Sequence, residues 1–443
     1  MADWLKMTAS DLGRGIGAGE IDPIELTEVY LAAINAHEYT DRIYARLTED
    51  RARAEAAAAA DRAKKGVRRG LLDGVPISWK DLYDTAGVGT EAGSALLKGR
   101  VPDTDAVVLA NATRAGLVCL GKTHMTELAF SGLGLNDVTE TSPNSTNPAL
   151  VAGGSSSGAA TSVAFDLAAA GIGSDTGGSV RIPSVWNDLV GLKTTHGLLS
   201  VEGVVPLCES FDTVGPLCRS VEDAAELLAV MSGEAAPDLS GATLVGKRFM
   251  VLETVALPNC RPEPLAAFEA AVARLEAAGA EVVRGEIPEV ERAMELAGCV
   301  FTSEAYAQWH NEIEANPDAM FPPVRERFRA GAEFSAVQFI ESWQELRQLR
   351  GIYQKATAGF DAVLVPSSPI LPPDIERLLS DHAYFVSENL LALRNTRIGN
   401  LMGLCGLTLP TDTPTCGITA LCDPFTEAKL LRLGVAMEEV VRG

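Results

Sequence analysis

The stretch GGSSSGAATSVAFDLAAAGIGSDTGGSVRIP, residues 153–183, joins two clusters of glycine and serine through an apolar segment. It holds six serines, seven glycines and no histidine. Its middle predicts a small-residue helix and then a buried strand, where small side chains let backbones approach closely. Turns such as 153–158 and 175–179 can direct several backbone N–H groups toward one place. If one of these serines is a nucleophile, some group other than a local histidine must accept its proton.

The chain around this stretch alternates between strand-like and helix-like segments, which favours an α/β fold with helices on both faces of a sheet. Asp22 and Pro23 predict a helix start, because Asp caps a helix and Pro fits its first turn. The polar segment 133–154 predicts a long loop, and loops of that length are often functional. A linker is expected at 233–243 and a mainly helical region at 288–350. Other strands are predicted at 75–80, 117–123, 245–253, 281–285 and 361–368, and other helices at 47–65, 105–115 and 264–280.

The composition is that of a globular chain with an acidic surface. It has 443 residues, 47% of them hydrophobic, a formal net charge of −22 and a sequence pI of about 4.7. A surface this acidic disfavours nucleic acid and anionic lipid as partners. No apolar run is long enough for a transmembrane span, and the first residues lack the apolar core of a signal peptide. We therefore expect a cytoplasmic protein whose eight scattered cysteines are reduced and mostly buried.

The sequence supports neither a metal site nor a nucleotide-binding loop. The five histidines are spread widely, without HExxH or close Cys/His pairs, so no metal is expected. In AAAGIGSDTGGS the dinucleotide pattern GxGxxG would need glycine where Thr176 stands, and the chain has no P-loop pattern. No cofactor is predicted.

A nucleophile elbow is a third candidate. Residues 154–158 satisfy GxSxG, which would make Ser156 the nucleophile of an α/β-hydrolase. That motif needs a strand immediately before the serine, and the preceding PNSTNPALVAGG predicts a loop. Chance explains this short Gly/Ser-rich match better.

The fourth candidate combines both Gly/Ser clusters with a lysine. Lys80 ends the short apolar strand VPISW, Ser155 lies in the first cluster, and Ser179 ends DTGGS. A lysine kept neutral by burial can act as a base, and Ser–Lys arrangements are known substitutes for Ser–His. Taken one at a time, the clusters are explained better by tight turns without chemistry, and Lys80 by an ordinary surface lysine.

Residues 153–184 resemble the signature segment of the amidase signature family, at both clusters and through the run 175–183. Similarity extends over most of the chain and is weakest at 245–360. Further segments that resemble the family are 74–81, 87–94, 121–131, 210–216, 400–410 and 423–425. Departures are Trp79 where an aliphatic residue is usual, Asn187-Asp188 in place of a small pair, and Thr194 where proline is usual; none removes a catalytic residue.

The resemblance implies one α/β domain over 1–443, with a mixed, mostly parallel, twisted sheet covered by helices on both faces. It divides into N-terminal helices at 1–66, a catalytic core at 67–232, a variable, mainly helical region at 233–360 and a return to the core sheet at 361–443.

The resemblance also implies the roles of individual residues. Lys80 would be the base, Ser155 the middle serine and Ser179 the acylated serine, at intervals of 75 and 24 residues that suit the family. The oxyanion donors would be the backbone amides of Thr176, Gly177, Gly178 and Ser179. Ala129, Ser131 and Trp186 are candidates for substrate contact, and Asp175 and Arg181 for a structural ion pair beside the site.

The implied function is hydrolysis of a small carboxamide to a carboxylic acid and ammonia or an amine, without metal or cofactor. Two alternatives stay open: the glutaminase (A-type) subunit of a tRNA-dependent amidotransferase, and a non-catalytic scaffold of the same fold. Aryl, indoleacetamide-like and short aliphatic amides are all compatible with the sequence, as is ester cleavage. A homodimer is suggested by analogy alone.

Overall fold

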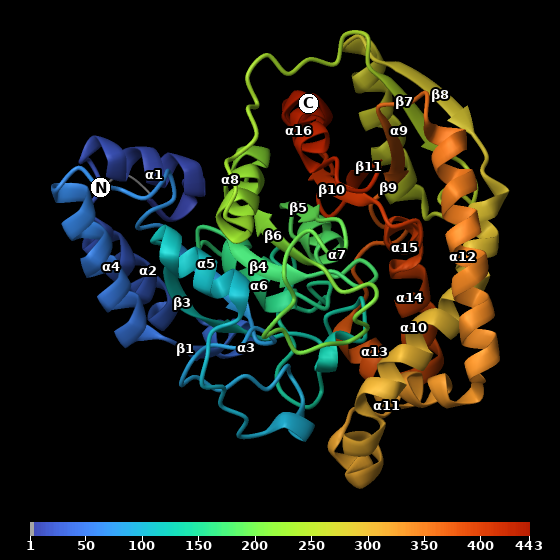
Figure 1. Ribbon diagram of the computed structural model, residues 1–443, viewed down its shortest axis with the longest axis horizontal. Coiled ribbons are helices and arrows are strands. Elements are labelled where there is room, and N and C mark those ends of the chain that lie inside the picture. The colour runs from blue at the N-terminus through green and yellow to red at the C-terminus, as the bar shows by residue number, and fades with distance from the viewer. Residues whose placement is uncertain (1–3) are drawn as a thin grey trace.

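The computed structural model describes residues 4–443, so the first three residues of the expected N-terminal segment 1–66 lie outside the described residues. An eleven-stranded sheet runs through the described chain in the order β1-β3-β2-β4-β6-β5-β10-β11-β9-β7-β8. Figure 1 shows the N-terminal helices α1, α2 and α4 at one end of the molecule and α10 and α12 at the other. The strands are β1 Tyr44–Leu47, β2 Pro76–Lys80, β3 Val118–Thr123, β4 Gly171–Ser174, β5 Val190–Lys193, β6 Val214–Cys218, β7 Arg248–Leu252, β8 Glu281–Gly285, β9 Ala362–Pro366, β10 Cys405–Pro410 and β11 Gly417–Cys422.

Helices cover the sheet, and the predicted ones begin within about two residues of their expected starts. Asp22 accepts a hydrogen bond from the Ile24 amide at 2.8 Å, and α2 begins at Pro23 as expected. The helices are α1 Ala9–Ala18, α2 Pro23–Ala36, α3 Thr40–Ile43, α4 Glu49–Lys64, α5 Val107–Ala115, α6 Ser157–Ala164, α7 Arg181–Trp186, α8 Val221–Ser232, α9 Pro262–Ala277, α10 Pro288–Ala315, α11 Pro322–Arg329, α12 Ala336–Thr357, α13 Ile375–Ser380, α14 His382–Ala392, α15 Arg394–Leu401 and α16 Glu427–Arg442.

The sheet is mixed, as predicted, but it is not mostly parallel. Of the ten strand pairs among the described residues, six are antiparallel and four are parallel. The six-residue connection 411–416 between β10 and β11 allows only an antiparallel hairpin, since a parallel crossover needs a dozen residues or more. β1, which was not predicted, also pairs antiparallel with β3 at one edge of the sheet.

The signature stretch contributes one interior strand, β4, to the sheet. α6 and β4 come from its small-residue segment, as predicted, and both are buried. A Cβ added to Gly171 would lie 2.5 Å from the Ala159 carbonyl oxygen, so only glycine allows this approach of strand and helix. The stretch thereby places its two Gly/Ser clusters at the ends of one tightly packed unit.

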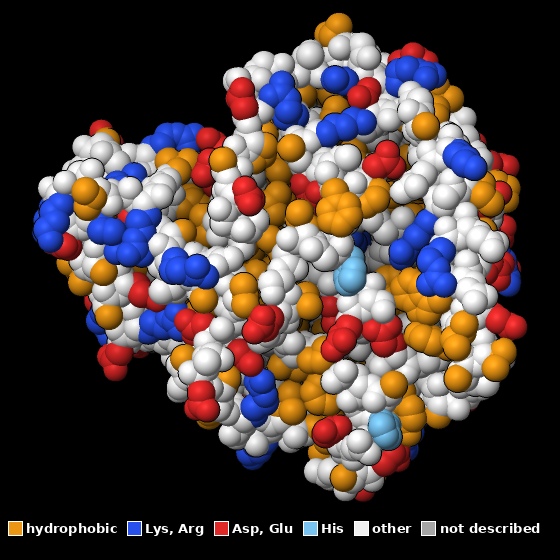
Figure 2. Space-filling model, viewed as in Figure 1, with side chains coloured by type: hydrophobic (Ala, Val, Ile, Leu, Met, Phe, Trp, Pro, Cys, Tyr) orange, Lys and Arg blue, Asp and Glu red, His pale blue; other side chains and the backbone are white. Residues whose placement is uncertain are grey.

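The expected linker 233–243 lies in an irregular segment between α8 and β7, and the segment 133–154 is a loop as predicted. One large apolar cluster nevertheless continues on both sides of the linker, from the N-terminal helices to α16. All eight cysteines are free, and all but Cys260 are buried. Within residues 4–443 no helix is both long and apolar enough to cross a membrane. On the face drawn in Figure 2, acidic and basic side chains are interspersed.

Candidate active site

Lys80 lies at the end of the interior strand β2, where its side chain is fully buried. Its ammonium nitrogen Nζ donates hydrogen bonds to Ser155 Oγ at 2.7 Å and to Ser174 Oγ at 2.8 Å. The structure thus brings together two of the three predicted catalytic side chains, which are 75 residues apart in the sequence. Ser174, at the end of β4, was not predicted as a partner of this lysine.

The surroundings of Lys80 favour its neutral form. Burial lowers its pKa from the ordinary value of a lysine to about 7, although the charges of Asp175 and Asp212 oppose this effect. A buried amine loses the hydration that stabilises its ammonium form. At neutral pH a large share of the molecules therefore carry an amine at this position, which can accept a proton.

The first Gly/Ser cluster holds its serines in different environments. The peptide bond between Gly154 and Ser155 is cis. Ser156 is fully buried, and its hydroxyl exchanges hydrogen bonds with the backbone of Ser174, accepting from the N–H at 3.3 Å and donating to the carbonyl at 3.2 Å. The Ser156 amide also donates to the Ser179 carbonyl at 3.3 Å, which ties the two clusters together. The geometry therefore gives Ser156 a structural position and disfavours the nucleophile-elbow hypothesis.

The turn before Ser179 is organised by a buried carboxylate. Asp175 accepts hydrogen bonds from Arg181 Nε at 3.0 Å, from Arg181 Nη2 at 2.9 Å and from Asn400 Nδ2 at 2.9 Å. Although burial acts to raise the pKa of Asp175, the Arg181 guanidinium and these donors hold it well below its usual range. Asp175 and Arg181 thus form the structural ion pair that was expected beside the site.

The same carboxylate changes the expected set of oxyanion donors. The Gly178 amide donates to Asp175 Oδ1 at 2.8 Å, so it is directed away from any substrate carbonyl. Gly178 has φ +140°, a conformation that glycine adopts and other residues rarely do. Among the described residues, no hydrogen bond occupies the amides of Thr176, Gly177 and Ser179. Three of the four predicted donors therefore remain available.

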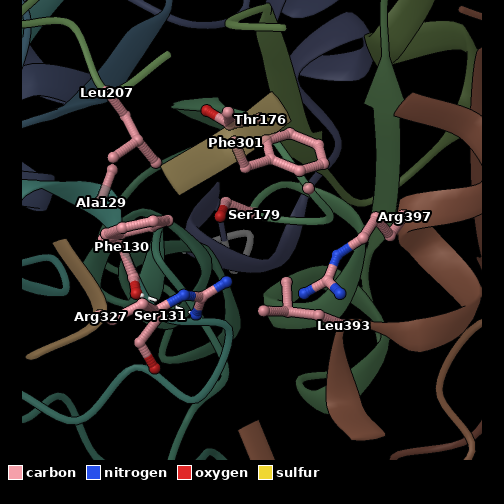
Figure 3. Close-up of a pocket in the computed structure, with 11 residues that line it drawn as sticks. Ala129, Phe130, Ser131, Thr176, Ser179, Leu207, Phe301, Arg327, Leu393 and Arg397 are labelled. Atoms are coloured by element: carbon pink, nitrogen blue, oxygen red, sulfur yellow. Dashed lines mark hydrogen bonds between the residues drawn. The ribbon is translucent and has the colours of Figure 1, made fainter. Parts of the chain in front are cut away.

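Ser179 lines a pocket together with Thr176 and Gly177 (Figure 3). Ala129 and Ser131, two of the predicted substrate contacts, line the same pocket. Ala129 has φ +60°, and it ends the short helical turn Glu127–Ala129. The cavity is narrow, about 20 Å³, which corresponds to little more than one water molecule.

Trp186 does not line this pocket, which corrects the prediction. Its side chain is fully buried, its Nε1 donates to the Ile370 carbonyl at 3.2 Å, and its ring lies beneath Gly153. Helix α7 separates it from Ser179, and six helical residues span about 9 Å. Nearness in sequence was therefore a poor guide to nearness in the pocket.

Six pocket residues were not predicted from the sequence: Phe130, beside the predicted Ala129 and Ser131, and five others. The five others come from segments far from the signature, where no recognisable motif marks them. They are Leu207, Phe301, Arg327, Leu393 and Arg397. No group of three or more His, Cys, Asp or Glu side chains that could hold a metal occurs within residues 4–443.

A family model described as Amidase matches residues 25–431. The chain belongs to the amidase signature family. The resemblance drawn from residues 153–184 is thereby confirmed, and this amidase shares an α/β fold with the solved structures of its relatives.

Among curated relatives, the 2-amino-5-chloromuconic acid deaminase of Comamonas testosteroni is 34% identical, over 98% of this chain and 97% of its own. The A-type subunit of the glutamyl-tRNA(Gln) amidotransferase of Chloroflexus aurantiacus is 29% identical, over 99% and 98%. Among solved structures, an amidase superposes with a TM-score of 0.88 at 30% identity, covering 98% of this amidase and all of that chain. The peptide amidase of Stenotrophomonas maltophilia does so with a TM-score of 0.84 at 28% identity, over 99% and 98%.

Proposed function

We propose that this amidase cleaves the C–N bond of a small carboxamide through an acyl intermediate on Ser179, with Ser155 and Lys80 as the proton relay. The observation that carries the proposal is the 2.7 Å contact between Lys80 Nζ and Ser155 Oγ in a fully buried setting. A neutral amine so placed can draw the proton of one serine, and that serine can in turn accept the proton of another.

The chemistry proceeds in two halves. Ser179 Oγ attacks the amide carbonyl while its proton passes through Ser155 to Lys80, and the amides of Thr176, Gly177 and Ser179 stabilise the negative oxygen. A single such donor is typically worth about 3–4 kcal/mol of barrier. The relay then returns the proton to the nitrogen, which leaves as ammonia or an amine. Water attacks the acyl group in the second half, and the acid is released.

Labelling with a fluorophosphonate probe and single substitutions tests this assignment. Ser179→Ala should abolish labelling and lower kcat about 10⁶-fold, because the nucleophile is lost. Lys80→Ala should lower kcat about 10²–10⁴-fold, as expected for a lost general base. Ser156→Ala is the matched control: it should keep the label and lower kcat only about fivefold for each of the two neutral hydrogen bonds that its hydroxyl makes. Full activity of Ser179→Ala with an inactive Ser156→Ala would establish the elbow mechanism instead.

A second candidate is the A-type glutaminase subunit of a tRNA-dependent amidotransferase. It is favoured by the relatives of that name, which align over nearly the whole chain. Hydrolysis of simple amides by the purified chain alone would support the free amidase. Glutamine hydrolysis that needs added partner proteins would support the amidotransferase assignment.

The third candidate, a non-catalytic scaffold, is opposed by the contact between Lys80 and Ser155. It would be supported if the fluorophosphonate probe failed to label Ser179 in a folded, monodisperse preparation.

A further inference from the structure

Two arginines line the pocket that contains Ser179. Arg327 belongs to α11 and Arg397 to α15, and Figure 3 shows their guanidinium groups reaching into the pocket on either side of Ser179. The same two side chains, with Phe301, also line an adjoining cavity of about 390 Å³. They therefore stand where the narrow pocket meets a wider space.

Neither guanidinium is paired with a carboxylate. Within residues 4–443, no Asp or Glu oxygen lies within 4.0 Å of the Arg327 or Arg397 side chain, although the chain has 59 acidic side chains and only 37 Lys and Arg. Arg327 donates one side-chain hydrogen bond, to the Phe130 carbonyl at 3.1 Å, and its Cζ lies 4.3 Å from the centre of the Phe130 ring. The Arg397 guanidinium makes no hydrogen bond to a described residue and lies at the edge of contact with Phe301, at 6.0 Å.

These two cations are held at an energetic cost. Burial lowers the pKa of Arg327 to about 9, and the charge of Arg397 contributes to this lowering; burial alone lowers the pKa of Arg397 to about 10. Both arginines are partly buried, and an unpaired charge that is partly removed from water is unfavourable unless something compensates it. Arg181, by contrast, follows the proposed nucleophile closely in sequence and is fully paired with Asp175. The donors that remain on Arg327 and Arg397 are thus available to an anion from outside the chain.

We propose that the substrate is an amide whose acyl part carries a carboxylate, which Arg327 and Arg397 bind while the amide carbonyl meets Ser179. This inference rests on the function proposed above. Guanidinium groups suit the planar, bidentate recognition of a carboxylate. Because both arginines and Ser179 line one narrow pocket, the acyl chain between carboxylate and amide is short. A four-carbon monoamide such as succinamate has this form, and its hydrolysis consumes water and yields succinate and ammonia.

The first experiment compares succinamate with butyramide, which has the same chain length without the second carboxylate. Measured by ammonia release, kcat/KM should be about 10- to 100-fold higher for succinamate than for butyramide. This is the range expected for charge-assisted hydrogen bonds. Arg397→Gln and Arg327→Gln should each lower kcat/KM for succinamate about 10- to 100-fold, mainly by raising KM, so that most of the preference over butyramide is lost. Equal or better turnover of butyramide by the unmodified chain would overturn the proposal.

Matched controls come from the same two helices. Arg329 on α11 pairs with Glu314 at the surface, and Arg394 on α15 donates to the backbone carbonyls of Pro258 and Ala256. Arg329→Gln and Arg394→Gln remove the same charge outside the pocket and should preserve the preference for succinamate. A loss of preference in these controls as large as in Arg397→Gln would assign the effect to overall charge and contradict the proposal.

A binding experiment separates this inference from the catalytic one. Calorimetry with succinate as the probe should detect binding to Ser179→Ala, and the additional Arg397→Gln should weaken that binding about 10- to 100-fold. Succinate binding without any amide hydrolysis by the unmodified chain would support the anion site and count against the proposed hydrolysis. Absence of succinate binding to a folded Ser179→Ala chain would refute the anion site whatever the activity.

Discussion

Lys80 must give up its proton before it can receive another one, so its titration controls the proposed reaction. Its pKa is lowered to about 7 by burial, and the neutral fraction falls as the pH drops below that value. We therefore expect kcat/KM for a neutral amide to fall about tenfold per pH unit below pH 7 and to level off above it. Rate measurements between pH 5 and 9 check this.

The control for this profile is Glu127, whose pKa burial raises to about 7. It accepts hydrogen bonds from Ser94 Oγ at 2.8 Å and from the Phe321 amide at 2.9 Å and does not touch Lys80. The Glu127→Gln variant should show the same fall of kcat/KM below pH 7. If kcat/KM of this variant no longer fell below pH 7, the titrating group would be the glutamate and not the lysine.

Asp175 holds the turn 175–179 together, and its loss should destabilise the protein. Asp175→Asn leaves Arg181 buried without its charge partner, and breaking a buried ion pair in this way typically costs about 3–5 kcal/mol of the free energy of unfolding. Urea unfolding measures the change. Asp166→Asn, at the partly exposed ion pair with Arg219, is the matched control and should cost at most about 1 kcal/mol. Similar losses in both variants would show that Asp175 has no special structural role.

At the scale of elements, the contact between the turn 175–179 and α15 fixes the site. A Cβ on Gly178 would lie 2.1 Å from Thr396 Oγ1, and Thr396 also donates to the Gly177 carbonyl at 2.8 Å. Gly178→Ala must therefore push α15 and the turn apart, and we expect kcat to fall about 100-fold, as for a displacement of about 1 Å in an active site.

The matched control for that substitution is Gly197→Ala. Gly197 also has a positive φ, of +83°, but no atom lies within 4 Å of an added Cβ. An alanine at position 197 has the same backbone strain but does not collide with another residue. We therefore expect kcat to stay unchanged even if the free energy of unfolding falls. Equal losses of kcat in the two variants would exclude the collision with Thr396 as the cause.

The sequence predicted the helices and strands better than it predicted which of them lie side by side. The unit α6–β4 follows from small residues whose packing is local, and the contact between Lys80 and Ser155 follows from long, specific motifs. The prediction of a mostly parallel sheet was wrong, because strand direction depends on connections such as 411–416 and on which strands become neighbours. Trp186, Arg327 and Arg397 show the same limit, since the direction of a side chain is set by packing between segments that lie far apart in the chain.

For the whole molecule, stability must come from packing, because the eight cysteines form no disulfide in the described chain. Burial raises the pKa of Cys119 to about 11 and those of Cys405 and Cys416 to about 12, so these thiols resist reaction. We expect a thiol reagent such as DTNB to titrate at most one cysteine in the native protein, Cys260, and all eight in guanidinium chloride. Cys260→Ser should remove the native signal. Rapid native reaction of several thiols would mean that the core opens readily.

The position of α15 late in the chain affects when the site can form. Thr396 and Asn400 contact Arg181 at 2.7 Å and 2.6 Å, and β10 then enters the sheet between β5 and β11. A ribosome that has translated the entire signature segment must still add more than 200 residues before these contacts exist. The nascent polypeptide therefore carries Ser179, the proposed nucleophile, without these contacts until α15 has been synthesised.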